Sequence, residues 1–95
     1  MNSEKEAVKR IIAKVLPKYG VKKAALFGSM VKGKFTKKSD VDLLVEFEGK
    51  KSLFDLLDLK FELEKQLKKE VDVVTYKSLH PLLRDKILSE QEAIL

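Results

Sequence analysis

The sequence contains no cysteine and only one histidine, His80. The lack of cysteine excludes disulfide scaffolds, cysteine zinc sites and thiol catalysis. A single histidine also excludes the usual histidine clusters for metals and Ser-His-Asp chemistry. No apolar run approaches about 18 residues, so no transmembrane helix and no membrane partner are expected. The first six residues are polar and acidic, unlike a signal peptide, and we therefore expect a cytoplasmic location.

The 95 residues suffice for one small domain spanning residues 1–95. With 44% hydrophobic and 37% charged residues, the composition is that of a globular protein, neither disordered nor fibrous. The net charge of +5 can favour nucleotides, RNA or an acidic partner. However, the lysines are scattered between apolar helix positions and lack interleaved aromatics, so nucleic acid is not the expected partner.

Apolar residues recur at helical spacing in three segments and form short β-type runs in three others. The predicted elements are helix 4–16, strand 21–27, a turn of helix within 30–38, strand 41–47, helix 53–67, strand 70–76 and helix 81–94. This alternation predicts an α/β (α+β) fold, a small three-stranded mixed sheet flanked by helices in the order αβ(α)βαβα. The segment 41–76 should form a right-handed parallel crossover, whereas the first two strands should run antiparallel.

Three carboxylates are expected at one end of this sheet. Asp40 and Asp42 are two residues apart, so both side chains point to one face of their strand. Asp72 lies near the start of the third strand, and the amino ends of parallel strands lie together. Three like charges on one face repel one another unless a cation lies between them. Mg²⁺ prefers such oxygen ligands, and two ions can assist transfer of a phosphoryl group.

A glycine and a serine follow the first strand beside these acids. Gly28 lets a phosphate approach the backbone, and Ser29 stands where a helix would begin, a position that favours anions. Taken alone, this pair is typical of a turn with a helix cap. The same loop resembles a phosphate-binding P-loop, but Phe35 replaces the serine or threonine which that motif requires.

The segment Leu26–Ser29 is followed, after ten residues, by Asp40–Val45. This spaced pattern resembles the nucleotidyltransferase signature of the DNA polymerase β superfamily. The short chain and the segment Val71–Thr75 are similar to the minimal nucleotidyltransferase (MNT) group of bacteria and archaea. The resemblance covers nearly the whole chain and implies the nucleotidyltransferase fold.

The resemblance implies that Gly28 and Ser29 hold the phosphates of a nucleoside triphosphate, with ATP as the substrate. Lys32, from the same loop, and Ser39, which fits the family pattern, are assigned to this nucleotide site. Relatives often carry arginine at the position of Met30 and at that of Lys32. Replacing arginine removes a bidentate phosphate donor.

The resemblance also implies that Asp40 and Asp42 bind Mg²⁺. Asp72 then completes the metal site or assists deprotonation of the acceptor. All three aspartates are therefore candidate catalytic residues and candidate metal ligands.

MNT proteins are often the antitoxin of a type VII toxin–antitoxin pair whose toxin is a HEPN-domain protein. The resemblance thus implies a protein adenylyltransferase that moves AMP from ATP to a tyrosine hydroxyl of that toxin. We expect no further domain for an acceptor in this chain and therefore expect a second chain or a homodimer mate to hold it. The alternative, favoured by Met30, is a catalytically weak or inactive antitoxin that acts by complex formation.

Overall fold

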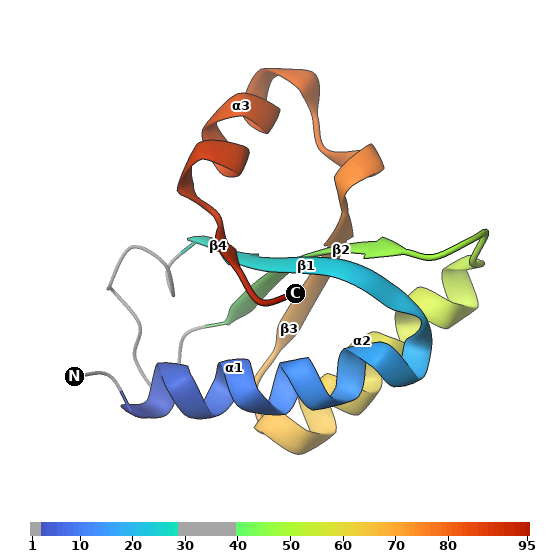
Figure 1. Cartoon of the computed structure of the whole chain (residues 1–95), viewed down its shortest axis with the longest axis vertical. Helices are drawn as coiled ribbons and strands as arrows, with labels where there is room; N and C mark the ends of the chain where they lie inside the picture. Colours follow the sequence, from blue (N-terminus) through green and yellow to red (C-terminus); the bar gives the residue numbers. More distant parts are fainter. Residues whose placement is uncertain (1–2, 29–39) are drawn as a thin grey trace.

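The computed structural model of the chain describes residues 3–28 and 40–95. Figure 1 shows α1 and α2 together on one side of a sheet and α3 on the other. In order, with 3-10 helices labelled η, the elements are α1 (Ser3–Val15), η1 (Leu16–Tyr19), β1 (Val21–Phe27), β2 (Val41–Phe47), α2 (Leu53–Leu67), β3 (Val71–Thr75), η3 (Tyr76–Ser78), α3 (Pro81–Glu90) and β4 (Glu92–Ala93).

The strand directions follow the sequence prediction. β1 runs antiparallel to β2, and β2 runs parallel to β3, with α2 connecting the two parallel strands. The predicted mixed α/β architecture is confirmed. The predicted number of strands is wrong, because the sheet has four strands in the order β3-β2-β1-β4. The turn of helix predicted within 30–38 falls in residues 29–39, outside the described residues.

Alternation along β2 and β3 divides the sheet into two faces. Val41, Leu43 and Val45 of β2 are buried with Val71 of β3 in the main hydrophobic core. Helices α1 and α2 cover this face, and α2 contributes the buried Leu59 to the same core. Residues between these positions must therefore point to the opposite face of the sheet.

The fourth strand replaces the end of the predicted last helix. Helix α3 ends at Glu90, and Glu92–Ala93 then pairs with β1. Lys5 Nζ and Lys9 Nζ of α1 lie 2.8 Å and 3.0 Å from the Glu92 carboxylate, and these ion pairs fasten the chain end to the first helix. β4 also covers the backbone of β1, which would otherwise be an open sheet edge.

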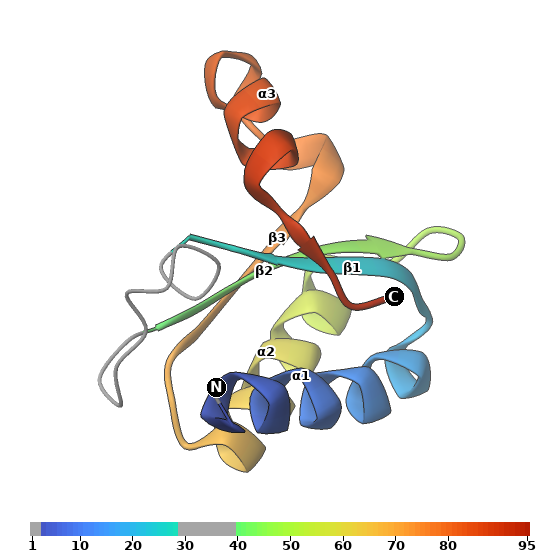
Figure 2. The same cartoon turned by 60° about the vertical axis from the view of Figure 1, so that its left-hand side comes forward.

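Helix α3 stands away from the rest of the molecule (Figure 2). None of its residues is buried, and Leu82 and Leu83 remain 85% and 54% exposed. His80 accepts a hydrogen bond at Nδ1 from the backbone N–H of Leu82, 3.1 Å away, and so caps the start of the helix. In the part of the chain that the structure describes, no helix combines the length and the apolar character needed to cross a bilayer.

We expect Glu92→Gln to weaken the attachment of β4 at neutral pH. Hydrogen bonds from Lys5 and then Lys9 hold the pKa of Glu92 below its ordinary value of 4.5. A lowered pKa stabilises the fold above that value, and the contribution disappears as the pH falls through the folded-state pKa. The free energy of unfolding should drop by about 1 kcal/mol or less at pH 7.

Urea unfolding of both proteins from pH 7 down to pH 2 measures this difference. The matched control is Glu48→Gln, since Glu48 is exposed and forms no ion pair within residues 3–28 and 40–95. A difference between wild type and Glu92→Gln that stayed constant down to pH 2 would contradict the prediction.

Candidate active site

The parallel pairing of β2 with β3 brings two of the predicted acids together. Asp42 and Asp72 are direct partners in the strand register. Asp42 is half-buried and Asp72 is exposed, both on the face opposite the main core. Asp40 is exposed and comes immediately before β2. The three carboxylates thus share one end of the sheet, as the sequence predicted.

The electrostatics of Asp42 reflect this grouping. Partial burial of its carboxyl group raises the pKa of Asp42 above 3.8, because burial penalises the charged form. The negative charges of Asp72 and Asp40 raise the pKa further, and so does a side-chain hydrogen bond with Asp72. Asp42 therefore holds a proton more readily than an isolated aspartate does. A cation placed there would relieve the same repulsion.

Gly28 brings the end of β1 against Asp42. Phe27, the last residue of β1, is the register partner of Asp42, and Gly28 follows with a φ of +76°. A Cβ atom built on Gly28 would overlap Oδ2 of Asp42 and lie 3.2 Å from its Cγ. Only glycine fits this turn without displacing the carboxylate. The Gly28 backbone therefore lies closer to the Asp42 carboxylate than a residue with a side chain would allow.

Two charged residues of α2 hold the start of β3. Lys60 Nζ donates to the carbonyl oxygen of Val71 at 2.7 Å, and the backbone N–H of Val71 donates to Glu64 Oε2 at 3.0 Å. Lys60 and Glu64 also pair with each other at 3.1 Å. This clamp satisfies both backbone groups of the residue before Asp72. It therefore fixes the position of β3 from which that aspartate projects.

Sequence reasoning did not single out Lys60 and Glu64. Their spacing of four residues on a helix is a detectable signal of a mutual pair. The backbone of Val71 as their common partner is a tertiary contact that helical spacing does not reveal. A further bond, from the Val41 N–H to the Glu70 carbonyl oxygen at 2.9 Å, ties the starts of β2 and β3 together.

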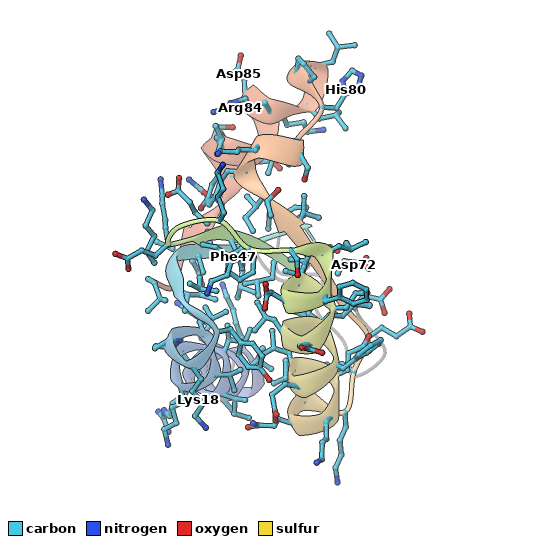
Figure 3. The ribbon with its side chains drawn as sticks, turned by 90° about the vertical axis from the view of Figure 1, so that its right-hand side faces the viewer. Lys18, Phe47, Asp72, His80, Arg84 and Asp85 are labelled. Carbon is cyan, nitrogen blue, oxygen red and sulfur yellow. The ribbon has the colours of Figure 1, made fainter. Side chains whose placement is uncertain are left out.

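Three predicted site residues, Ser29, Lys32 and Ser39, were expected to bind the nucleotide and lie outside the described residues. His80, together with Arg84 and Asp85, lies at the outer end of α3, far from Asp72 (Figure 3). The sole histidine is therefore a helix cap and takes no part in the acidic site.

The carboxylate groups of the three acids are of the chemical type that binds a hard cation. Carboxylate oxygens are ligands that Mg²⁺ prefers. Gly28 lies close to Asp42 and has no side chain that would crowd its carboxylate. Within residues 3–28 and 40–95, no three acidic or histidine side chains already converge tightly enough to hold a metal ion. The described site is thus an acidic pair with a third acid nearby, of a donor type that fits Mg²⁺.

The sequence of the chain matches a known family. Residues 10–95 match the family model described as polymerase beta, nucleotidyltransferase. The chain belongs to the polymerase beta nucleotidyltransferase family. The predicted membership and enzyme class are confirmed, and the acidic end of the sheet is the candidate active site of a nucleotidyltransferase.

Two relatives of the chain carry the name of one kind of nucleotidyltransferase, the protein adenylyltransferases. A Methanocaldococcus jannaschii protein, provisionally named a protein adenylyltransferase, is 53% identical over 88 residues, 93% of this chain and 95% of the relative. A Thermococcus cleftensis protein named protein adenylyltransferase MntA is 38% identical over 73 residues, 77% of this chain and 74% of the relative. The first likeness spans nearly the full length of both proteins.

Solved structures agree with this fold. One, provisionally described as a minimal nucleotidyltransferase, superposes with a TM-score of 0.79 at 35% identity, over 90% of this chain and 88% of that one. Another is a complex of an MNT antitoxin with a tri-AMPylated HEPN toxin from Shewanella oneidensis, with a TM-score of 0.76. At 19% identity, over 96% of this chain and 71% of that one, the second likeness supports the fold alone.

We expect Gly28→Ala to destabilise the chain more than Gly49→Ala does. Both glycines have a φ of +76°, so alanine pays the same conformational penalty, about 1–2 kcal/mol, at either position. Only at Gly28 does the new methyl group also meet Asp42, whereas at Gly49 it meets nothing within 4 Å.

Chemical unfolding of the two variants measures the difference. A further loss of about 1 kcal/mol or more for Gly28→Ala is expected from the overlap. Equal losses for the two variants would contradict the close approach of Gly28 to Asp42.

Proposed function

We propose that the chain is a Mg²⁺-dependent protein adenylyltransferase. It transfers AMP from ATP to a tyrosine hydroxyl of a HEPN-domain toxin and thereby acts as the antitoxin. The observation that carries this proposal is the Asp42–Asp72 pair in register beside the Gly28 turn. The relatives named protein adenylyltransferases and the tri-AMPylated toxin of the Shewanella oneidensis complex support the substrate and the partner.

In the proposed reaction, the acceptor hydroxyl oxygen bonds to the α-phosphorus of ATP. The bond from that phosphorus to the oxygen bridging the α- and β-phosphates breaks, and pyrophosphate leaves. The hydroxyl proton passes to a carboxylate. Asp72 is suited to accept it, because its side chain is exposed and lies beside Asp42, which already shares a hydrogen bond with it.

The other residues bind and orient the substrate. Asp40 and Asp42 would hold Mg²⁺, which when bound supplies positive charge for the phosphates and the leaving group. Gly28 exposes its backbone to the phosphates where a side chain would obstruct them. Ser29, Lys32 and Ser39 are proposed to contact the nucleotide. The Lys60–Glu64 clamp keeps β3 in place while Asp72 accepts the proton.

A second candidate function is inhibition of a toxin by binding alone. The observation that favours it is the exposure of Leu82 and Leu83 on α3, a helix with no buried residue. Such a helix can bind a partner whether or not the acidic site is active. The two functions differ in whether the partner leaves the complex carrying AMP.

The decisive experiment incubates the purified chain with Mg²⁺, ATP labelled at the α-phosphate and a HEPN-domain protein. Adenylyl transfer predicts label on a tyrosine of the HEPN protein and release of pyrophosphate. Asp42→Asn should reduce labelling by about a hundredfold or more, since loss of a ligand to the proposed cation removes several kcal/mol of transition-state stabilisation. Peptide mass spectrometry locates the label.

The matched control is Asp58→Asn, an exposed aspartate on α2 that belongs neither to the acidic site nor to α3. It should label the partner at the wild-type rate. Circular dichroism should show Asp42→Asn folded, because the change removes a partly buried and repelled charge. A stable complex without label for the wild-type chain would refute adenylyl transfer and support the binding-only antitoxin.

A further inference from the structure

A basic hollow lies at the other end of the sheet, where β2 and β3 finish. Its volume is about 600 Å³, within the range of pockets that hold small molecules. Val45 and Thr75, which are register partners, line it. Four lysines and two aromatic residues also line this hollow, which is here called the lysine pocket: Lys22, Lys50, Lys51, Lys77, Phe47 and Tyr76.

The lysine pocket is separate from the acidic site. Asp42 and Asp72 lie three residues before Val45 and Thr75 in their strands, about 10 Å at the usual rise per residue. Figure 3 shows Phe47 and Asp72 on opposite sides of α2. A ligand in the lysine pocket would therefore not use the carboxylates.

The charge of the pocket is strongly positive. One acidic side chain, Glu46, lines it against the four lysines. None of the four lysines forms a salt bridge within residues 3–28 and 40–95, although Lys51 also attracts Asp55. Four ammonium groups around one hollow raise the local concentration of anions. They provide hydrogen-bond donors for phosphate without any metal ion.

The aromatic wall of the pocket is held in place. Lys23 Nζ lies 4.9 Å from the centroid of the Tyr76 ring, a cation–π contact. The Tyr76 hydroxyl donates to Oε1 of Gln91 at 3.0 Å. Phe47 is half-buried, with part of its ring against the main core. Rings fixed in this way present apolar surface to a ligand without losing side-chain freedom on binding.

We propose that the lysine pocket binds a nucleoside monophosphate without a divalent cation. The lysines receive the phosphate, and the base lies against the ring of Phe47 or Tyr76. An acidic peptide would satisfy the lysines but would make no use of the fixed rings. This site is additional to the proposed triphosphate site, because it has the opposite charge and lies at the opposite end of the strands.

The test is a titration of the ¹⁵N-labelled chain with AMP in the presence of EDTA, followed by amide chemical shifts. Residues around the pocket, such as Gly49, Lys50 and Lys77, should shift, while Gly28 and Asp42 should not. Adenosine alone and inorganic phosphate alone should each bind more weakly than AMP. EDTA removes any metal-dependent binding at the acids, so this outcome is independent of adenylyl transfer.

The double variant Lys50→Ala/Lys77→Ala should bind AMP at least about tenfold more weakly. The control, Lys14→Ala/Lys86→Ala, removes the same charge from exposed positions on α1 and α3 and should bind as wild type does. Equal weakening in both variants, or AMP shifts confined to Gly28 and Asp42, would overturn the proposal. A poly-glutamate peptide that shifts the pocket amides when AMP does not would assign the pocket to an acidic protein segment instead.

Discussion

The strict alternation of side chains along β2 and β3 links the core of this protein to its chemistry. Val41, Leu43 and Val71 point toward α1 and α2 and are fully buried. Asp42, between Val41 and Leu43, and Asp72, next to Val71, must then share the other face. A slip of one residue in either strand would bury an aspartate in the core and expose its apolar neighbours. The hydrophobic core therefore specifies the register that makes the acidic pair.

That register is unfavourable for the acids themselves, and the surrounding structure compensates. Burial and like charge both raise the pKa of Asp42, so holding the two carboxylates together lowers the stability of the folded chain. The Lys60–Glu64 clamp on Val71 prevents β3 from moving away to relieve the repulsion. Gly28 approaches the Asp42 carboxylate with backbone alone. Strain at a site that the rest of the fold holds rigid is typical of a binding or catalytic centre.

The elements that could be predicted from the sequence are those with strong local signals. β1, β2 and α2 begin and end at the predicted residues, because apolar runs, Gly28 and the Ser52 capping box mark their limits. The in-register meeting of Asp42 and Asp72 was also predictable, since a helix between two strands implies a parallel crossover. This topology alone predicts that the two acids meet at one end of the sheet.

What could not be predicted depends on partners far apart in the chain. β4 is two residues long and carries no pattern of its own, and Lys5, 87 residues earlier, holds its first residue. The hydrogen bond of Lys60 with Val71 and the approach of Lys51 to Gly20 are also contacts between different elements of the fold. Local periodicity contains no information about such contacts, so the sequence pattern predicted neither of them.

The charge distribution across the sheet is the last consequence of this topology. Because β2 and β3 are parallel, both strands start at one end and finish at the other. The acids lie at the amino ends of the two strands. The turns that follow the strands bring Lys50 and Lys77 together at their carboxyl ends. An anion is therefore repelled at one end unless a cation accompanies it, and attracted at the other without one. The two proposed sites therefore differ in whether a phosphate needs a metal ion to bind there.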